Sequence, residues 1–175
     1  LPPDTTALLE RLVRGGHSLV ALFQACSRNV DQHMARLTGL NALIRGGYWH
    51  VTETEHPWRL TDAGSRCFPD LPREMNIPAS HPFAIHPEPE VEILAEDTDR
   101  NCAVITRRPL DKGQIYWIGS GCKSADNKNI YGSPKATLMF GAEKDDEIKR
   151  LWLNHPGWKK MFSAVVQRAL QEAQE

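Results

Sequence analysis

The spacing of apolar residues predicts three helices in the first part of the chain. The first helix is capped by Asp4 or Thr5 and ends at Gly15. The second covers residues 17–26, and the third starts at Arg28. At 100° per residue, the apolar faces of these helices contain Leu8, Leu9, Leu12, Val13, Leu19, Leu22, Phe23, Val30, Met34 and Leu37, with Asn41 on the same side.

A different pattern follows the helices. The run WHVTETEHPWRLTDAG, residues 49–64, predicts two short strands that fold back on each other before a helix begins. In the second half, β-branched and aromatic runs predict strands at VEIL (91–94), CAVITRR (102–108), QIYWIGS (114–120) and KATLMF (135–140). Helices are predicted over residues 145–154 and from Trp158 to about Glu172.

Prolines divide the chain between these two patterns. Six of the twelve prolines lie between Pro69 and Glu90, where neither a helical nor an alternating period is visible. Such composition is typical of an extended linker or a strap along the surface. We therefore expect a first domain over residues 1–68, a proline-rich linker over 69–89 and a second domain over 90–175.

The first domain resembles a known DNA-binding fold. The run SRNVDQHMARLTGLNALIRGGYWHV, followed by WRLTDAG, is similar to the winged helix-turn-helix of MarR-like and related bacterial regulators. The residues that carry this resemblance are Leu43, Ile44, Gly46, Gly47, Tyr48 to Val51, and Leu60 to Gly64. It implies an α+β protein in which a winged helix of three helices and a hairpin wing covers residues 4–68. A small antiparallel-sheet module with two C-terminal helices would follow.

In such a fold the third helix would read the major groove of double-stranded DNA. Arginine pairs with guanine, and asparagine or glutamine with adenine, through two hydrogen bonds each. The candidate DNA contacts are Arg28, Asn29, Gln32 and Arg36 on that helix, with Arg59 of the wing on a phosphate. The same residues would also suit an ordinary solvated helix face. Gly39 has low helix propensity, so the helix is expected to stop early or bend there.

The tip of the predicted wing is acidic. Glu53 and Glu55 would repel phosphate, which disfavours a wing inserted into the minor groove. This leaves open a second function, a protein-interaction adaptor whose acidic wing meets a basic partner, or a non-catalytic part of a DNA-processing complex. A homodimer is also expected, because two-fold readers match palindromic sites.

The composition indicates a globular protein and disfavours a membrane span or a zinc site. The chain has 41% apolar and 25% charged residues and a net charge of −1, as expected for a globular protein. Residues 1–68 carry a net +1 and residues 69–175 a net −2. No apolar run is long enough to span a membrane. The four cysteines form no CxxC pair, which favours reduced thiols in the cytoplasm, without a zinc site.

Two enzymatic interpretations fail on spacing. The loop GSGCKS, Gly119 to Ser124, resembles a phosphate-binding loop, but Trp117 replaces a required glycine. The acidic residues that begin at Glu90 are not followed by the Glu-x-Lys step expected of a metal-dependent nuclease. We therefore expect no catalytic residues, no cofactor and no enzymatic activity.

Overall fold

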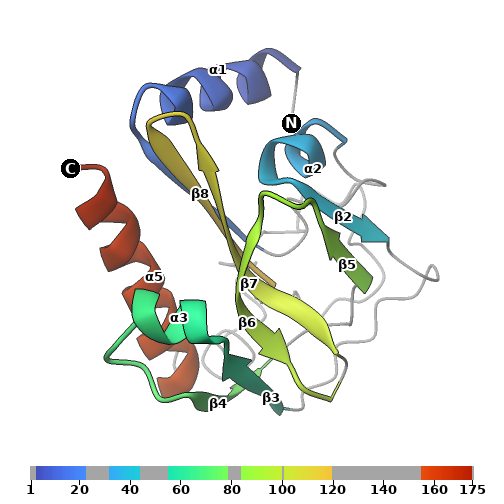
Figure 1. The fold of residues 1–175 in the computed structure, drawn as a ribbon, viewed down its shortest axis with the longest axis vertical. Helices are drawn as coiled ribbons and strands as arrows, with labels where there is room; N and C mark the ends of the chain where they lie inside the picture. Colours follow the sequence, from blue (N-terminus) through green and yellow to red (C-terminus); the bar gives the residue numbers. More distant parts are fainter. Residues whose placement is uncertain are drawn as a thin grey trace, which may run out of the picture.

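The computed structural model describes residues 3–22, 32–43, 55–78, 84–99, 101–119 and 155–174. Its helices are α1 (Pro3–Arg14), α2 (Gln32–Thr38), α3 (Asp62–Cys67) and α5 (Pro156–Glu172). Its strands are β1 (Ser18–Leu22), β2 (Leu40–Leu43), β3 (Glu55–Leu60), β4 (Glu74–Pro78), β5 (Ala84–Pro87), β6 (Glu92–Asp97), β7 (Cys102–Leu110) and β8 (Gly113–Ile118) (Figure 1).

Six of these strands form one mixed sheet in the order β1-β8-β7-β6-β3-β4. Strands β1 and β8 are parallel, with Ser18 opposite Gln114, and the other neighbours are antiparallel. A separate antiparallel pair joins β2 to β5. The main sheet therefore takes strands from before and after residues 69–89, and that segment itself contributes β4 and part of the β2–β5 pair.

Both faces of the sheet are covered. Along β8, Tyr116 and Ile118 pack in one buried cluster, whereas Ile115 and Trp117 pack in another. Since successive side chains of a strand point to opposite faces, these clusters lie on opposite sides of the sheet. Residues of α5 belong to the first cluster and residues of α1 and α2 to the second, which makes three layers.

The expectation of a winged helix is wrong. The run Ser18–Leu22, expected within the second helix, is the edge strand β1 paired in parallel with β8. A short apolar run fits a buried strand as well as a helix, because periodicity alone does not distinguish them. Without that helix the three-helix arrangement does not form, and the fold is an α/β sandwich instead of a winged helix followed by a small module.

The expected recognition helix is short. Within the described residues α2 covers only Gln32–Thr38, and residues 23–31 lie outside them. The helix stops before Gly39, as expected, because this residue adopts a φ of 67° that favours glycine. A Cβ at Gly39 would also come 2.6 Å from Cγ2 of Val91.

The predicted wing is replaced by a different strand pairing. Strand β3 pairs with β4 on one side and with β6 on the other, so its partners come from later in the chain. A helix does begin at Asp62, as predicted, because the Thr61 hydroxyl accepts a hydrogen bond from the Gly64 amide. The first predicted wing strand lies outside the described residues, as do the predicted strand over 135–140 and helix over 145–154.

Helices α1 and α5 begin and end close to where the sequence predicts them. Helix α1 ends before Gly15 as predicted, but its buried face holds Thr6 and Val13, while Leu8 and Leu12 are 47% and 42% exposed. The strands β6, β7 and β8 and the last helix are also where the sequence places them. The helix α5 begins at Pro156, because the Nδ1 atom of His155 accepts a hydrogen bond from the Trp158 amide.

None of the described helices is long and apolar enough to cross a membrane.

Candidate functional site

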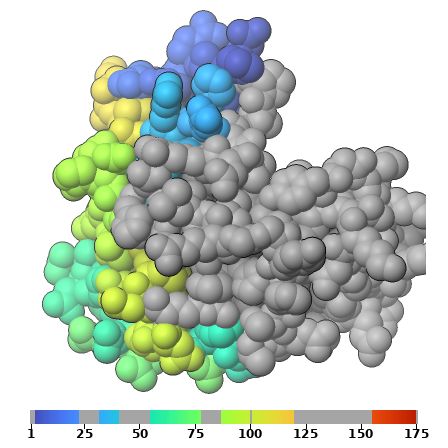
Figure 2. Space-filling view, turned by 90° about the vertical axis from the view of Figure 1, so that its right-hand side faces the viewer, coloured from blue at the N-terminus to red at the C-terminus, as the bar shows by residue number. Residues whose placement is uncertain are grey.

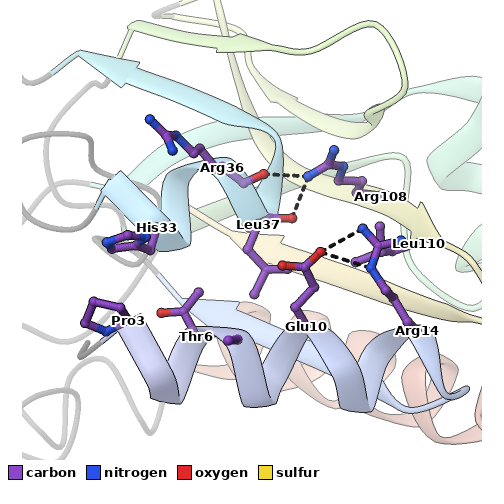
Figure 3. A pocket seen from close by; sticks show the side chains of 10 residues that line it. Pro3, Thr6, Glu10, Arg14, His33, Arg36, Leu37, Arg108 and Leu110 are labelled. Atoms are coloured by element: carbon purple, nitrogen blue, oxygen red, sulfur yellow. Dashed lines mark hydrogen bonds and ion pairs between the residues drawn. The ribbon is translucent and has the colours of Figure 1, made fainter.

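A cavity of about 310 Å³ opens between α1 and α2 at one end of the molecule. The two helices lie next to each other on the surface in Figure 2, and Figure 3 shows the side chains between them. The lining residues come from α1, α2 and β7: Pro3, Thr6, Ala7, Glu10, Arg14, His33, Arg36, Leu37, Arg108 and Leu110. This volume lies at the small end of the range for ligand-binding pockets.

Arg14 fixes one wall of the cavity. Its Nε and Nη2 atoms donate hydrogen bonds of 2.9 and 2.7 Å to Glu10, one helical turn away. Its Nη1 atom donates a 2.9 Å hydrogen bond to Asp111 in the turn between β7 and β8. The pairing with both carboxylates raises the pKa of Arg14. The arginine therefore ties α1 to the sheet and stays charged.

Arg108 fixes the opposite wall. Its Nη1 atom donates to the carbonyl oxygens of Arg36 and Leu37 at the end of α2, and its Nη2 atom donates a 2.7 Å bond to Glu90. A cation at the C-terminus of a helix is stabilised by the free carbonyl groups there. Because Arg108 and Arg14 hold the two helices separately against the sheet, the cavity between them is formed without a ligand.

A buried hydroxyl faces this cavity. Thr6 is only 5% exposed, and its Oγ1 atom has no hydrogen-bond partner among the parts of the chain that the structure describes. Its side chain points from α1 toward α2 in Figure 3. The Nε atom of Arg108 is likewise buried without a described acceptor. Buried polar atoms are nearly always hydrogen-bonded, so these two donors indicate that an acceptor is missing.

The cavity is lined by more basic than acidic side chains, but the ion-pair partners outside the lining balance the charge. The lining has three guanidinium groups, on Arg14, Arg36 and Arg108, and one carboxylate, on Glu10. Including the ion-pair partners Asp111 and Glu90 brings the sum to zero. Within the described ranges, the exposed guanidinium of Arg36 has neither an ion pair nor a hydrogen bond. In Figure 3 it points away from α1, at the outer side of α2.

The predicted DNA contacts are dispersed. Gln32 and Arg36 are both exposed on α2, but only Arg36 lines the cavity. Arg59 is exposed on β3, in register with Glu74 and Glu96. Arg28 and Asn29 lie outside the described residues. The individual residue assignments stay predictions, but the winged helix that gave them their role is absent from the fold.

A second group of polar side chains joins α5 to the sheet. We call it the Tyr116 cluster; it consists of Cys67, Glu92, Arg107, Tyr116, Arg168 and Glu172. The Tyr116 hydroxyl donates a 2.5 Å hydrogen bond to Oε2 of Glu172, and the Sγ atom of Cys67 lies 3.9 Å from the same hydroxyl. Arg107 and Arg168 each donate a 2.9 Å bond to Oε1 of Glu172.

The protonation states of the Tyr116 cluster suit a structural role. Burial, with the hydrogen bond to Glu172, raises the pKa of the Tyr116 phenol far above its usual range. Burial also raises the pKa of the Cys67 thiol, although Arg107 opposes the shift. Burial alone would lower the pKa of Arg107, but its bond to Glu92 raises it overall. A nucleophilic cysteine needs the thiolate, which this environment disfavours.

Apart from Arg36, sequence reasoning missed the residues of both groups. The Glu10 and Arg14 pair has the i, i+4 spacing that could have been recognised on the predicted first helix. The adjacent Arg107 and Arg108 interrupt an apolar strand. Because neighbouring residues of a strand point to opposite faces of the sheet, this pair indicates that each face has polar partners at this position. Thr6 carries no such signal. No group of three or more His, Cys, Asp or Glu side chains that could hold a metal occurs in the described ranges, and the absence of a metal stays a prediction.

The fold is similar to that of several solved proteins. The chain matches the cytoplasmic proteins STM1381 and STM3548 of Salmonella typhimurium with TM-scores of 0.59 and 0.58 and identities of 11% and 9%. The alignments cover 94% and 95% of this chain but 60% and 61% of those chains. A Thermoplasma acidophilum protein named for a component of GMP synthase matches at a TM-score of 0.52 and 9% identity, over 98% of this chain and 67% of that one.

These similarities concern the fold alone. They support an α/β fold and overturn the predicted resemblance to the winged helix of the MarR-like regulators. The predicted function was sequence-specific DNA binding by a transcriptional regulator. This prediction is also wrong, because it rested on the winged helix. No protein-family model and no curated protein matches the sequence. The chain spans about three fifths of the two Salmonella proteins.

Proposed function

We propose that this domain binds a small molecule carrying an oxyanion, such as a carboxylate or a phosphate, in the cavity between α1 and α2, and that it does so without catalysis. The observation that carries the proposal is the buried Thr6 hydroxyl, which has no partner in the described structure and faces a cavity lined by Arg14, Arg36 and Arg108, although the Arg36 guanidinium is turned to the outer side of α2 (Figure 3). An oxyanion would accept the hydrogen bond that Thr6 can donate.

The geometry supports binding at a preformed site. Arg14 and Arg108 are already held by Glu10, Asp111 and Glu90, so little side-chain ordering would accompany binding. Arg36 is the exposed cation next to the cavity, and rotation of its side chain would bring a guanidinium to the mouth. Guanidinium groups pair with carboxylate and phosphate through two parallel hydrogen bonds.

The non-catalytic part of the proposal rests on the Tyr116 cluster. There the structure places a thiol, a phenol and carboxylates close together, in the way that active sites often do. However, the raised pKa values keep the Cys67 thiol and the Tyr116 phenol protonated, and Glu172 is held by both Arg107 and Arg168. These groups are better suited to joining α5 to the sheet than to attacking a substrate.

A cytoplasmic location and self-association belong to the same proposal. The two Salmonella proteins of similar fold are described as cytoplasmic. Cys67 forms no disulfide within the described residues, which agrees with a reducing compartment. A homodimer was expected from the sequence and stays a prediction, as does a protein partner.

Isothermal titration calorimetry with inorganic phosphate and with malonate tests the proposal. We expect saturable binding of at least one of them to the wild-type protein. In Thr6→Val, which keeps the side-chain shape but removes the donor, the affinity should fall about tenfold, since one hydrogen bond to a charged group contributes that much.

The chain offers a matched control in Thr5→Val. Thr5 is the neighbouring residue on α1 and does not line the cavity, so its loss should leave the affinity unchanged. Equal weakening in Thr5→Val and Thr6→Val would contradict a specific role for Thr6. Failure of both anions to bind the wild-type protein would overturn the proposed function.

A further inference from the structure

A second groove, of about 460 Å³, lies on the other side of β7. Alternate residues of this strand point to opposite faces, so Arg108 and Leu110 line the first cavity, whereas Arg107 and Pro109 line the groove. The groove is completed by Pro89, Glu90, Val91, Glu92 and Gln114. It is distinct from the site of the proposed function and does not rest on it.

Gln114 lines this groove and has an unpaired acceptor. Its Oε1 atom is buried and has no hydrogen-bond donor in the described part of the chain. Ser18, its partner in register on β1, also has a buried Oγ atom that is unpaired within the described residues. A buried carbonyl oxygen without a donor is costly, and a ligand that donates a hydrogen bond would remove that cost.

The lining of the groove has more acidic than basic side chains. The lining side chains carry two carboxylates, on Glu90 and Glu92, and one guanidinium, on Arg107, a net charge of −1. The balance becomes zero when the linked ion-pair partners Arg108, Glu172 and Arg168 are included. The hydrogen bonds from Arg107 to Glu92 both go to the Oε2 oxygen. The first cavity has the opposite character, with unpaired donors and an excess of guanidinium groups in its lining.

The remaining walls are apolar. Pro89, Val91 and Pro109 line the groove beside the polar groups. A short alkyl chain could pack against these side chains while its charged end reaches Gln114 and Glu92. A primary amine carries three donors and is protonated at neutral pH, because its pKa lies near 10.

We propose that this groove binds a primary alkylammonium group, supplied either by a free amine or by a lysine side chain. The apolar walls would hold the alkyl part, the Oε1 atom of Gln114 would accept one hydrogen bond, and the carboxylate of Glu92 would balance the charge. This chemistry is the same for both sources, and the choice of titrant separates them.

The test is a titration of the wild-type protein with n-butylammonium, followed by calorimetry and by the NMR signals of the Gln114 side-chain amide. We expect saturable binding that shifts those signals. Gln114→Met, which keeps the length of the side chain but removes the acceptor, should weaken binding about tenfold. Gln32→Met is the matched control, because Gln32 is exposed on α2 and lines neither cavity.

A second variant keeps the test decisive if Gln114→Met is poorly folded. Gln114→Glu retains an acceptor and adds a negative charge, so it should bind n-butylammonium more tightly than the wild type. Uncharged n-butanol should not bind. The proposal is overturned if n-butylammonium does not bind, if n-butanol binds equally well, or if Gln114→Glu binds the amine more weakly than the wild type.

The source of the group is decided with Nα-acetyl-lysine amide. Binding of this compound at least as tight as that of n-butylammonium supports a lysine side chain, whereas binding of n-butylammonium alone supports a free amine. Both outcomes support the shared chemistry. Equal affinities of the wild type and a well-folded Gln114→Met for both compounds would remove Gln114 from the site and contradict the proposal.

Discussion

The Tyr116 hydroxyl donates a 2.5 Å hydrogen bond to the carboxylate of Glu172, and this bond joins the buried strand β8 to the last turn of α5. The tyrosine is fully buried, and the Glu172 carboxylate also accepts from Arg107 and Arg168. One carboxylate thus receives donors from two strands of the sheet and from its own helix. The position of α5 depends on this residue, although the helix also packs through Met161 and Val165.

Tyr116→Phe should therefore destabilise the protein. The ring remains buried, but the charge-assisted hydrogen bond is lost, which we expect to lower the free energy of unfolding by about 2 kcal/mol. Urea denaturation measures this change. A double-mutant cycle with Glu172→Gln should show coupling between the two positions, and strictly additive effects would contradict the interaction.

The same bond makes stability depend on pH in the alkaline range. Because the pKa of Tyr116 is raised in the folded state, the unfolded chain loses this proton first, from pH about 10 upward. The contribution of Tyr116 is therefore complete below that pH and declines as the pH rises further. The free energy of unfolding should fall more steeply above pH about 10 in the wild type than in Tyr116→Phe. Parallel pH profiles would contradict this.

Two buried threonines should respond in opposite ways to the same substitution. The Thr38 hydroxyl donates a 2.8 Å bond to the carbonyl oxygen of Met34, whereas the Thr6 hydroxyl has no described partner. Thr38→Val should lower the free energy of unfolding by about 1 kcal/mol, and Thr6→Val should leave it unchanged or raise it. Thermal unfolding without ligand measures both. A loss of stability in Thr6→Val equal to that in Thr38→Val would show that Thr6 is satisfied within the protein.

His155 offers a test of how α5 begins. Its Nδ1 atom accepts a bond from the Trp158 amide, and its Nε2 atom lies 2.9 Å from Glu55, so the neutral ring carries its proton on Nε2. His155→Ala should cost about 1 kcal/mol of stability through loss of the cap. His155→Asn also removes the ring but can cap the helix, and it should recover most of that loss in urea denaturation. Equal losses in the two variants would assign the effect to Glu55 instead.

The close packing of β8 against the end of α1 and the residue before β1 depends on a glycine. A Cβ at Gly113 would lie 2.1 Å from the carbonyl oxygen of Val13 and 2.3 Å from that of His17. Because backbone atoms cannot move aside easily, Gly113→Ala should lower the free energy of unfolding by about 3 kcal/mol. Gly15→Ala is the control, since its Cβ would stay 3.3 Å from the nearest oxygens. Similar stabilities of the two variants by thermal unfolding would contradict this packing.

The parts of the fold that were predictable are local in sequence. Strands β7 and β8 are joined by the short turn after Leu110, where Asp111 adopts a positive φ, so a proline-and-glycine turn between two β-rich runs identifies them. Helix α5 has a clear apolar period. By contrast, β1 pairs with β8, which lies almost a hundred residues later in the chain, and no local sequence pattern indicates that pairing. The similarity of residues 49–64 to a wing was also misleading, because β3 pairs with β4 and β6, which come later in the chain.

The candidate site was less predictable than the fold. It combines α1, α2 and β7, and only the Glu10 and Arg14 pair has a spacing that could be recognised from the sequence. Arg36 was selected from the sequence as an exposed residue of a helix, and the structure does expose it, next to a cavity instead of on a recognition helix. The importance of Thr6 follows only from its burial without a partner, which requires the tertiary structure.

Oxyanion binding between α1 and α2 can be observed by titrating isotopically labelled protein with inorganic phosphate while amide signals are recorded by NMR. We expect saturable shifts at Thr6 and Ala7 of α1 and at Leu37 of α2, with β3 residues such as Arg59 unaffected. Saturable shifts that avoid α1 and α2, or no shifts with either phosphate or malonate, would contradict an oxyanion site between these helices.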